Sequence, residues 1–195
     1  MRRIVVNNNI TLDGVMQAPG RPDEDRRGGF EHGGWATPYF DSVMAEAAGK
    51  GMAGGGAMLF GRTTYEDFAK VWPNMPEDNL FAGFLNTAEK FVASRTLNEP
   101  LSWGNSTLLE GDAAGSVGRL KETDGPDLLI LGSGELIRSL IPHDLIDEFR
   151  LLIHPLVLGS GQRLFEGDGT FQKFQLVDTK TTTTDVIIAT YRLSR

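Results

Sequence analysis

The most informative stretch of this chain is Leu128-Leu129-Ile130-Leu131-Gly132-Ser133-Gly134-Glu135-Leu136. Four consecutive aliphatic residues predict a short buried strand, and Gly132 ends it. A helix is predicted to follow, from about Glu135 to Leu140. A strand, a glycine-rich turn and a helix in this order are typical of a parallel sheet, whose strands need long crossover connections.

The same unit recurs toward the N-terminus. Ile4-Val5-Val6 opens a buried strand, and Ala57–Phe60 is a second one that ends at Gly61, before a helix that starts at Thr63. The other elements predicted in this half of the chain are helices at Asn79–Thr87 and Ala113–Lys121 and strands at Phe91–Ala93 and Thr107–Leu109. This alternation predicts helices on both faces of a parallel sheet.

One further helix is predicted from a start signal. Thr37-Pro38 places a capping hydroxyl before a proline, which favours the first turn of a helix, and the helix is expected to continue toward Ala48. The glycine-rich run Gly49–Gly56 is interpreted as a loop before the next strand.

The last third of the chain has a different pattern. Asp147–Leu158, Phe174–Thr184 and Asp185–Leu193 are predicted as long strands with little helix between them, the last two as an antiparallel hairpin that turns at Asp185. The prediction is therefore one α/β domain over residues 1–195. Its central mixed sheet is mostly parallel, with an antiparallel C-terminal hairpin, and helices flank it.

Composition excludes several classes of protein. The 195 residues have a net charge of -7, which argues against nucleic acid or an anionic membrane surface as the main partner. The apolar runs are too short to cross a bilayer, and the N-terminus has no signal-peptide pattern. Without cysteine there is no disulfide, and the three histidines, His32, His143 and His154, have no metal-ligand spacing. We therefore expect a cytoplasmic protein without a metal.

Three predicted strand ends carry groups suited to phosphates. Gly61-Arg62-Thr63-Thr64 joins a strand to a helix, so free backbone N–H groups and a guanidinium meet there. Ser94-Arg95 follows a strand and suits a 2′-phosphate, which distinguishes NADP from NAD. Gly132-Ser133-Gly134 could hold a pyrophosphate, although it is not a G-x-G-x-x-G fingerprint because Ile137 takes the third glycine position. Taken singly, each is also compatible with an ordinary turn.

Two other stretches are candidates for a substrate site. Asn9 to Gly14 ends the first strand, and its Asp13 could orient a substrate or relay a proton, or simply form an Asp-Gly turn. The long polar segment from Gln17 to Thr37 is predicted to be either an active-site lid or disordered.

The Leu12-Asp13-Gly14 turn, Gly61–Tyr65, Ser94-Arg95, Gly132–Leu136 and Pro155–Gly159 occur in the order found in one superfamily. The chain resembles the dihydrofolate-reductase-like superfamily over nearly its whole length. Within that superfamily it is most similar to the branch of the riboflavin-biosynthesis reductase, the RibD C-terminal domain. The resemblance implies a three-layer fold, NADPH as the cofactor and a homodimer. The cofactor contacts that it implies, together with those from the strand ends, are Asn9, Gly14, Gly61, Arg62, Thr63, Thr64, Ser94, Arg95, Gly132, Ser133, Gly134, Glu135 and Leu136.

The predicted activity is hydride transfer from NADPH to a pterin- or pyrimidine-like heterocycle. A 5-amino-6-(5-phosphoribosylamino)uracil reductase is the first choice, and dihydrofolate reduction is the second. Asp13 and then Asp41 are the candidate catalytic carboxylates. Trp35, Tyr65 and Arg163 are the candidate substrate contacts, although Tyr65 could instead pack in the core. A non-catalytic NADP-binding module and a ligand-free structural protein remain as alternatives.

Overall fold

A computed structural model describes residues 1–76, 78–166 and 170–194, which form one eight-stranded sheet with helices on both faces. The strand order is β4-β3-β2-β5-β1-β6-β8-β7. The strands are β1 Ile4–Thr11, β2 Ala57–Gly61, β3 Lys90–Ala93, β4 Ser106–Leu109, β5 Leu128–Leu131, β6 Glu148–His154, β7 Phe174–Thr181 and β8 Ile187–Leu193.

The sheet is mixed, as predicted. The six strands from β4 to β6 pair in parallel, whereas β8 pairs antiparallel with β6 and β7 pairs antiparallel with β8. Asp185 adopts a positive φ of 64° between β7 and β8, which is consistent with the predicted turn. Because parallel strands end at the same edge, the carboxyl ends of β3, β2, β5 and β1 lie next to one another.

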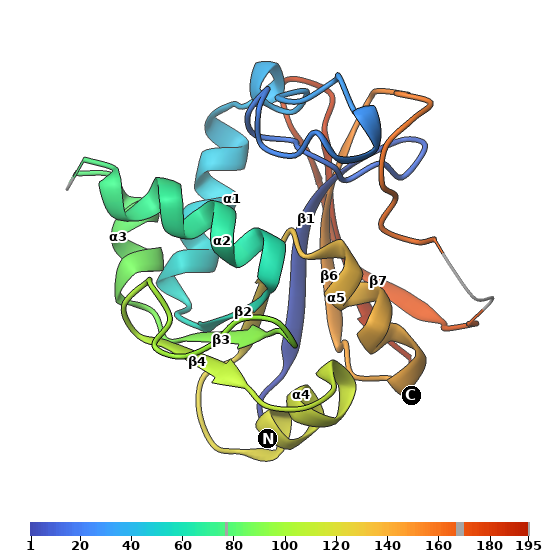
Figure 1. Ribbon diagram of the computed structural model, residues 1–195. Coiled ribbons are helices and arrows are strands. Elements are labelled where there is room, and N and C mark those ends of the chain that lie inside the picture. The colour runs from blue at the N-terminus through green and yellow to red at the C-terminus, as the bar shows by residue number, and fades with distance from the viewer. Residues whose placement is uncertain (77, 167–169, 195) are drawn as a thin grey trace.

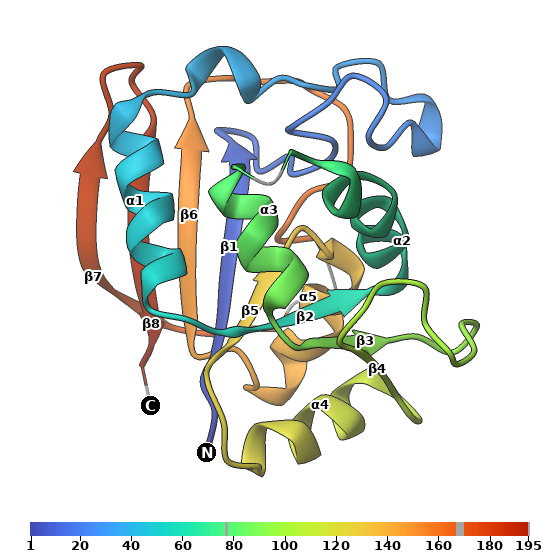
Figure 2. The ribbon, with the colours of Figure 1, turned by 90° about the vertical axis from the view of Figure 1, so that its left-hand side faces the viewer.

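Helices form a layer on each side of this sheet (Figure 1). Helices α1, α2 and α3 cover one face, and α4 and α5 cover the other; Figure 2 shows α1 and α3 in front of the strands. Their bounds are α1 Ser42–Ala53, α2 Arg62–Val71, α3 Leu80–Thr87, α4 Ala113–Glu122 and α5 Gly134–Leu140, with 3-10 turns at Arg27–Gly29, Thr37–Tyr39, Trp72–Asn74 and Ile141–His143.

The core is divided between the two faces of the sheet. On the α4/α5 face, Ile4, Val6 and Ile130 pack among aliphatic side chains from the helices. On the α2/α3 face the packing is mainly aromatic, around Phe60 and Trp103. The central strands β2 and β5 are apolar on both sides because helices cover both faces.

The helix predicted from Thr37-Pro38 toward Ala48 is present at Ala48 but starts later than predicted. Residues Thr37–Tyr39 form only a 3-10 turn, and α1 starts at Ser42 with Asp41 as its N-cap, accepting from Met44 N at 2.8 Å. Helix α1 then continues through Gly49 and Gly51, which the sequence analysis interpreted as a loop. Asp41 is a better N-cap than Thr37 because its carboxylate also binds the backbone N–H and hydroxyl of Thr183.

Across the described ranges, no helix is both long and apolar enough to cross a membrane.

His154 has a structural position at the end of β6. It is completely buried, with the Trp35 and Tyr39 rings edge-on against it at 5.1 and 5.4 Å between centroids. Its Nε2–H donates to Asn9 Oδ1 at 2.9 Å. Burial lowers the pKa of His154 to about 4, so the ring is neutral near pH 7 and orients the Asn9 side chain.

We predict that His154 makes stability depend on pH below neutrality. Its folded pKa lies below its unfolded value, so the unfolded chain binds the extra proton as the pH falls from about 6.5 to about 4. Stability should therefore decrease over this window, by about 3 kcal/mol at most. Urea unfolding across the window should show a shallower pH dependence for His154→Gln than for the unmodified protein. Equal slopes would contradict the prediction.

Candidate functional site

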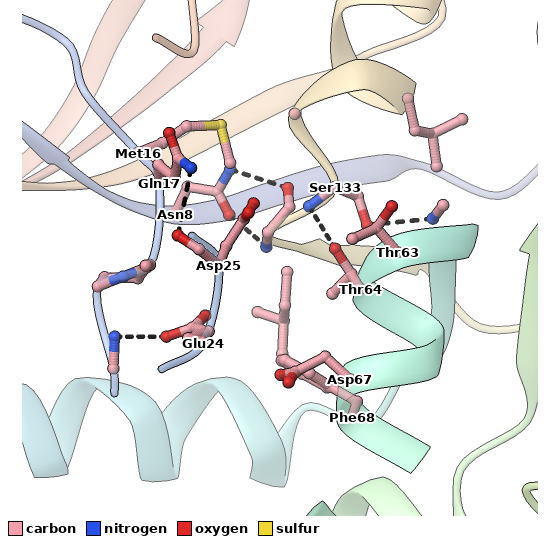
Figure 3. Close-up of a pocket in the computed structure, with 18 of the residues that line it drawn as sticks. Asn8, Met16, Gln17, Glu24, Asp25, Thr63, Thr64, Asp67, Phe68 and Ser133 are labelled. Atoms are coloured by element: carbon pink, nitrogen blue, oxygen red, sulfur yellow. Dashed lines mark hydrogen bonds between the residues drawn. The ribbon is translucent and has the colours of Figure 1, made fainter. Parts of the chain in front are cut away.

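A cavity of about 760 Å³ lies at the carboxyl ends of the parallel strands. Its floor is formed by residues of β1 and by the segments that follow β2, β3 and β5, and its outer wall by part of residues 17–37 (Figure 3). Its size is within the usual range for small-molecule sites, and the ends of parallel strands are where open α/β sheets bind ligands.

Asn8 holds the floor of the cavity together. This buried side chain accepts a hydrogen bond from Gly132 N at 2.7 Å and donates one to Gly132 O at 3.1 Å, so that a β1 residue clamps the turn after β5. Gly132 has φ +62°, and a Cβ at this position would lie 3.2 Å from the Thr64 side chain. Both facts explain why glycine occupies this position.

Ser133 joins the same turn to β2 and α2. Its backbone N–H donates to Thr64 Oγ1 at 3.0 Å, and its Oγ accepts from Gly61 N at 3.1 Å. Ser133 itself has a positive φ of 53°. Two of the three strand ends that the sequence analysis proposed for phosphates are therefore bonded directly to each other, and Figure 3 shows the Ser133–Thr64 contact.

One end of the cavity is rich in hydrogen-bond donors. Helix α2 begins at Arg62, and the backbone N–H groups of its first turn have no partner within the helix. Beside it, Ser94 Oγ accepts from Thr96 N and Leu97 N, each at 3.1 Å, and lies 3.5 Å from the hydroxyl of Thr96. Arg95 lines the cavity and forms no ion pair with any residue in the described ranges. This end of the cavity is suited to phosphate.

Residues 17–37 are ordered by contacts within the segment and with the body of the protein. Val15, Ala18, Phe30 and Trp35 form part of a small apolar cluster, and Trp35 Nε1–H donates to Gln17 O at 2.7 Å. Arg27 lines the cavity and donates to Glu135, at the start of α5, at 3.0 Å. The segment therefore adopts the arrangement of a lid that is closed against the sheet.

The other end of the cavity carries carboxylates and aromatic rings. Glu24, from the 17–37 segment, and Asp67, from α2, lie on opposite sides of it (Figure 3). Burial raises the pKa of Glu24 above its ordinary value, and the negative charge of Asp67 adds to this effect. Phe68 and Trp72 line the cavity beside Asp67.

Of the predicted cofactor contacts, all but Gly14 line this cavity. Those that do are Asn9, Gly61, Arg62, Thr63, Thr64, Ser94, Arg95, Gly132, Ser133, Gly134, Glu135 and Leu136. Gly14 instead lies in the turn after β1, where its φ is +79° and its carbonyl accepts from Leu164 N.

The two predicted catalytic carboxylates are not among the described residues that line the cavity. Asp13 accepts from Thr11 Oγ1 at 2.6 Å, Leu158 N at 3.2 Å and Gly159 N at 2.9 Å. These bonds, the Thr11 bond first among them, lower the pKa of Asp13. Asp41 is the N-cap of α1 described above. Both carboxylates hold loops in place, and neither is suited to donate a proton near pH 7.

The three predicted substrate contacts are also elsewhere. Tyr65 is buried in the aromatic core, where its hydroxyl accepts from Trp103 N at 2.8 Å. Trp35 is buried in the apolar cluster beneath the 17–37 segment. Arg163 donates to Asp13 O at 2.9 Å, so it reinforces the turn after β1. Each has a packing or bridging role that depends on distant partners.

Several cavity residues were not found from the sequence. Asp67 and Phe68 follow Thr63 and Thr64 by four residues, so helical periodicity places all four on one face of α2, and this signal was available. Asn8 had a weaker signal, a polar side chain inside a buried strand. Glu24 had none, because its sequence neighbours resemble those of any solvated loop.

Comparison with known proteins agrees with this geometry. The family model described as the RibD C-terminal domain matches residues 2–188. The chain belongs to this family. Among curated proteins, Bacillus subtilis (strain 168) YyaP is 28% identical over 97% of this chain and 94% of its own length. YwjB of the same strain is 29% identical over 63% of this chain and 66% of its own. Both are described as uncharacterized.

Solved structures show the same fold. A Shewanella sp. PV-4 protein, assigned provisionally to riboflavin biosynthesis, has a TM-score of 0.68 and 19% identity, covering 99% of each chain. A pyrimidine reductase-like protein of Corynebacterium diphtheriae has a TM-score of 0.61 and 13% identity, covering 100% of this chain and 92% of its own. At these identities the likeness shows the RibD-like fold alone.

We predict that Asp13 contributes to stability and not to ligand binding. Asp13→Ala removes the acceptor for the Leu158 and Gly159 N–H groups and should lower the free energy of unfolding by about 2 kcal/mol. The affinity for a nucleotide in the cavity should stay within about twofold of that of the unmodified protein. Urea unfolding and calorimetric titration measure the two effects. A large loss of nucleotide affinity in a stably folded Asp13→Ala protein would contradict the prediction and show that Asp13 contributes to ligand binding.

Proposed function

We propose that this chain is an NADPH-dependent reductase that acts on a pterin- or pyrimidine-like heterocycle. The observation that carries the proposal is the donor-rich end of the cavity, where the Ser94 hydroxyl and Arg95, which has no ion pair among the described residues, lie beside the first turn of α2. Membership of the RibD C-terminal domain family supports a reductase.

The residues of the cavity fit this cofactor. Arg62, Thr63, Ser94 and Arg95 would hold the adenosine phosphates, since two guanidinium groups, hydroxyls and free N–H groups together match a phosphate-rich ligand. The turn at Gly132–Leu136 would lie against the pyrophosphate, because the positive φ values at Gly132 and Ser133 bring its backbone close to the cavity. When bound, the nicotinamide supplies the hydride.

The chain itself would orient the reactants and exclude water. The Asn9 side chain, fixed by His154, provides amide hydrogen-bonding groups in the floor of the cavity. The 17–37 segment covers the cavity and would keep water from the reacting ring, as lids do in other enzymes. Carboxylates at the end opposite Arg95 would contact the substrate.

The alternative is a module that binds NADP without turnover. Oxidation of NADPH in the presence of a panel of pterins and aminopyrimidines distinguishes the two. A reductase consumes NADPH with at least one member of the panel, whereas a non-catalytic module binds it and consumes none.

We predict that Arg95→Ala weakens NADPH binding by about ten- to a hundredfold, because a charge-assisted contact to the 2′-phosphate is lost. NADH, which lacks that phosphate, should bind the unmodified protein and the variant with similar, weak affinity. Calorimetric titration with both nucleotides measures this. Lys50→Ala is the control, because it also removes one positive charge but does so on the outer side of α1. Absence of saturable binding by either nucleotide would overturn the proposed function.

A further inference from the structure

The cavity has two ends of opposite electrostatic character, and the end away from Arg95 is acidic. Its wall includes the carboxylates Glu24 and Asp67, and the guanidinium group of Arg21 pairs with Asp67. A ligand bound there meets an excess of negative charge.

Arg21 is already engaged, because it donates to Asp67 Oδ1 at 2.6 Å. Arg27, which also lines the cavity, donates to Asp25 and to Glu135. Although burial opposes it, this Arg27 contact lowers the pKa of Asp25. A phosphate group placed here would have to displace one of these carboxylates from its arginine and lie beside the others, which is electrostatically unfavourable.

Glu24 and Asp67 each have a carboxylate oxygen without a donor among the described residues. Glu24 Oε2 accepts from Gly20 N at 2.7 Å and Arg21 N at 3.1 Å, whereas Oε1 accepts from no residue in the described part of the chain. Asp67 Oδ2 is buried and has no hydrogen-bond partner among the described residues. A buried carboxylate oxygen without a donor is unfavourable, so a ligand N–H that reached it would be strongly bound.

The remaining wall at this end is aromatic. The Trp72 ring packs edge-on against Phe68 and Phe81, with centroid distances of 5.8 Å and 4.9 Å. Trp72 Nε1 is buried without a partner in the described ranges, and Phe40 lines the cavity with 65% of its surface exposed. Aromatic faces next to carboxylates favour a planar ring that carries N–H donors or a positive charge.

We infer that Glu24 and Asp67 bind the N–H edge of a planar, basic heterocycle that carries no phosphate. The inference rests on the proposed function for its assignment of the opposite end to the cofactor. The inference distinguishes between the two predicted substrates. A ring with an amidine-like edge, as in an aminopyrimidine or a pterin, fits the carboxylates, whereas a phosphoribosyl group does not.

Calorimetric titration with three small probes tests the inference. They are 2,4-diaminopyrimidine, which presents an amidine edge, uracil, which is similar in size but lacks that edge, and uridine 5′-monophosphate, which adds ribose and phosphate. Each is titrated with and without saturating NADPH. We expect 2,4-diaminopyrimidine to bind at least about tenfold more tightly than uracil, because its N–H groups meet charged acceptors. Uridine 5′-monophosphate should bind most weakly.

Two variants test whether Glu24 and Asp67 are responsible for the tighter binding of 2,4-diaminopyrimidine. Asp67→Asn and Glu24→Gln should each weaken 2,4-diaminopyrimidine binding by about ten- to a hundredfold, while uracil binding changes little. Glu46→Gln is the matched control, because Glu46 lies on α1 and pairs with Lys50 and Lys180 outside the cavity. Thermal melting confirms that each variant is folded. If loss of the Asp67–Arg21 pair unfolds Asp67→Asn, the Glu24→Gln variant alone tests the inference.

The inference fails if uridine 5′-monophosphate binds as tightly as 2,4-diaminopyrimidine, if both folded variants bind the latter unchanged, or if no probe binds with or without NADPH. Failure of the proposed function is a separate result. If 2,4-diaminopyrimidine binds through Glu24 and Asp67 but NADPH does not bind, the carboxylate site stands and the reductase proposal falls. If NADPH binds and 2,4-diaminopyrimidine does not, the carboxylate site falls and the reductase proposal stands.

Discussion

The paired hydrogen bonds between the Asn8 side chain and the Gly132 backbone are the constraint on which this structure most depends. They fix the turn after β5 against the middle of β1, and Ser133 then joins that turn to Gly61 and Thr64. Three strand ends and the start of α2 thereby become one rigid floor. A buried amide and backbone groups with positive φ are costly when unpaired, so the pairing is what makes this arrangement stable.

The cavity above this floor has cationic hydrogen-bond donors at one end and carboxylates at the other, groups that would neutralise one another if they were in contact. Cationic and donor groups lie around Arg95, and carboxylates lie around Glu24 and Asp67. Arg21, at the acidic end, is held by Asp67, so it does not offer an alternative phosphate site. Charges in a cavity walled by protein are screened less than charges at the surface, so groups at both ends of the cavity influence the direction in which a ligand binds.

Asp13 and Glu24 show why local sequence is a poor guide to which carboxylates face the cavity. Asp13 follows a strand and precedes a glycine, a position that fits a catalytic carboxylate or a turn equally well. Its partners Leu158 and Gly159 lie more than 140 residues away, and only they show that its charge is used to hold a loop. Glu24 is the converse, since it lies in a charged run typical of solvated loops, yet folding buries it in the cavity wall and raises its pKa.

The sequence by itself determined the order of strands and helices, the antiparallel end of the sheet and the three glycine- or hydroxyl-bearing turns, because these follow from periodicity and turn chemistry within a few residues. Only the tertiary structure decided the start of α1, where Asp41 gains a second partner in Thr183. It also decided which carboxylates face the cavity. Burial and charge pairing arise between segments distant in the chain, and no local pattern encodes them.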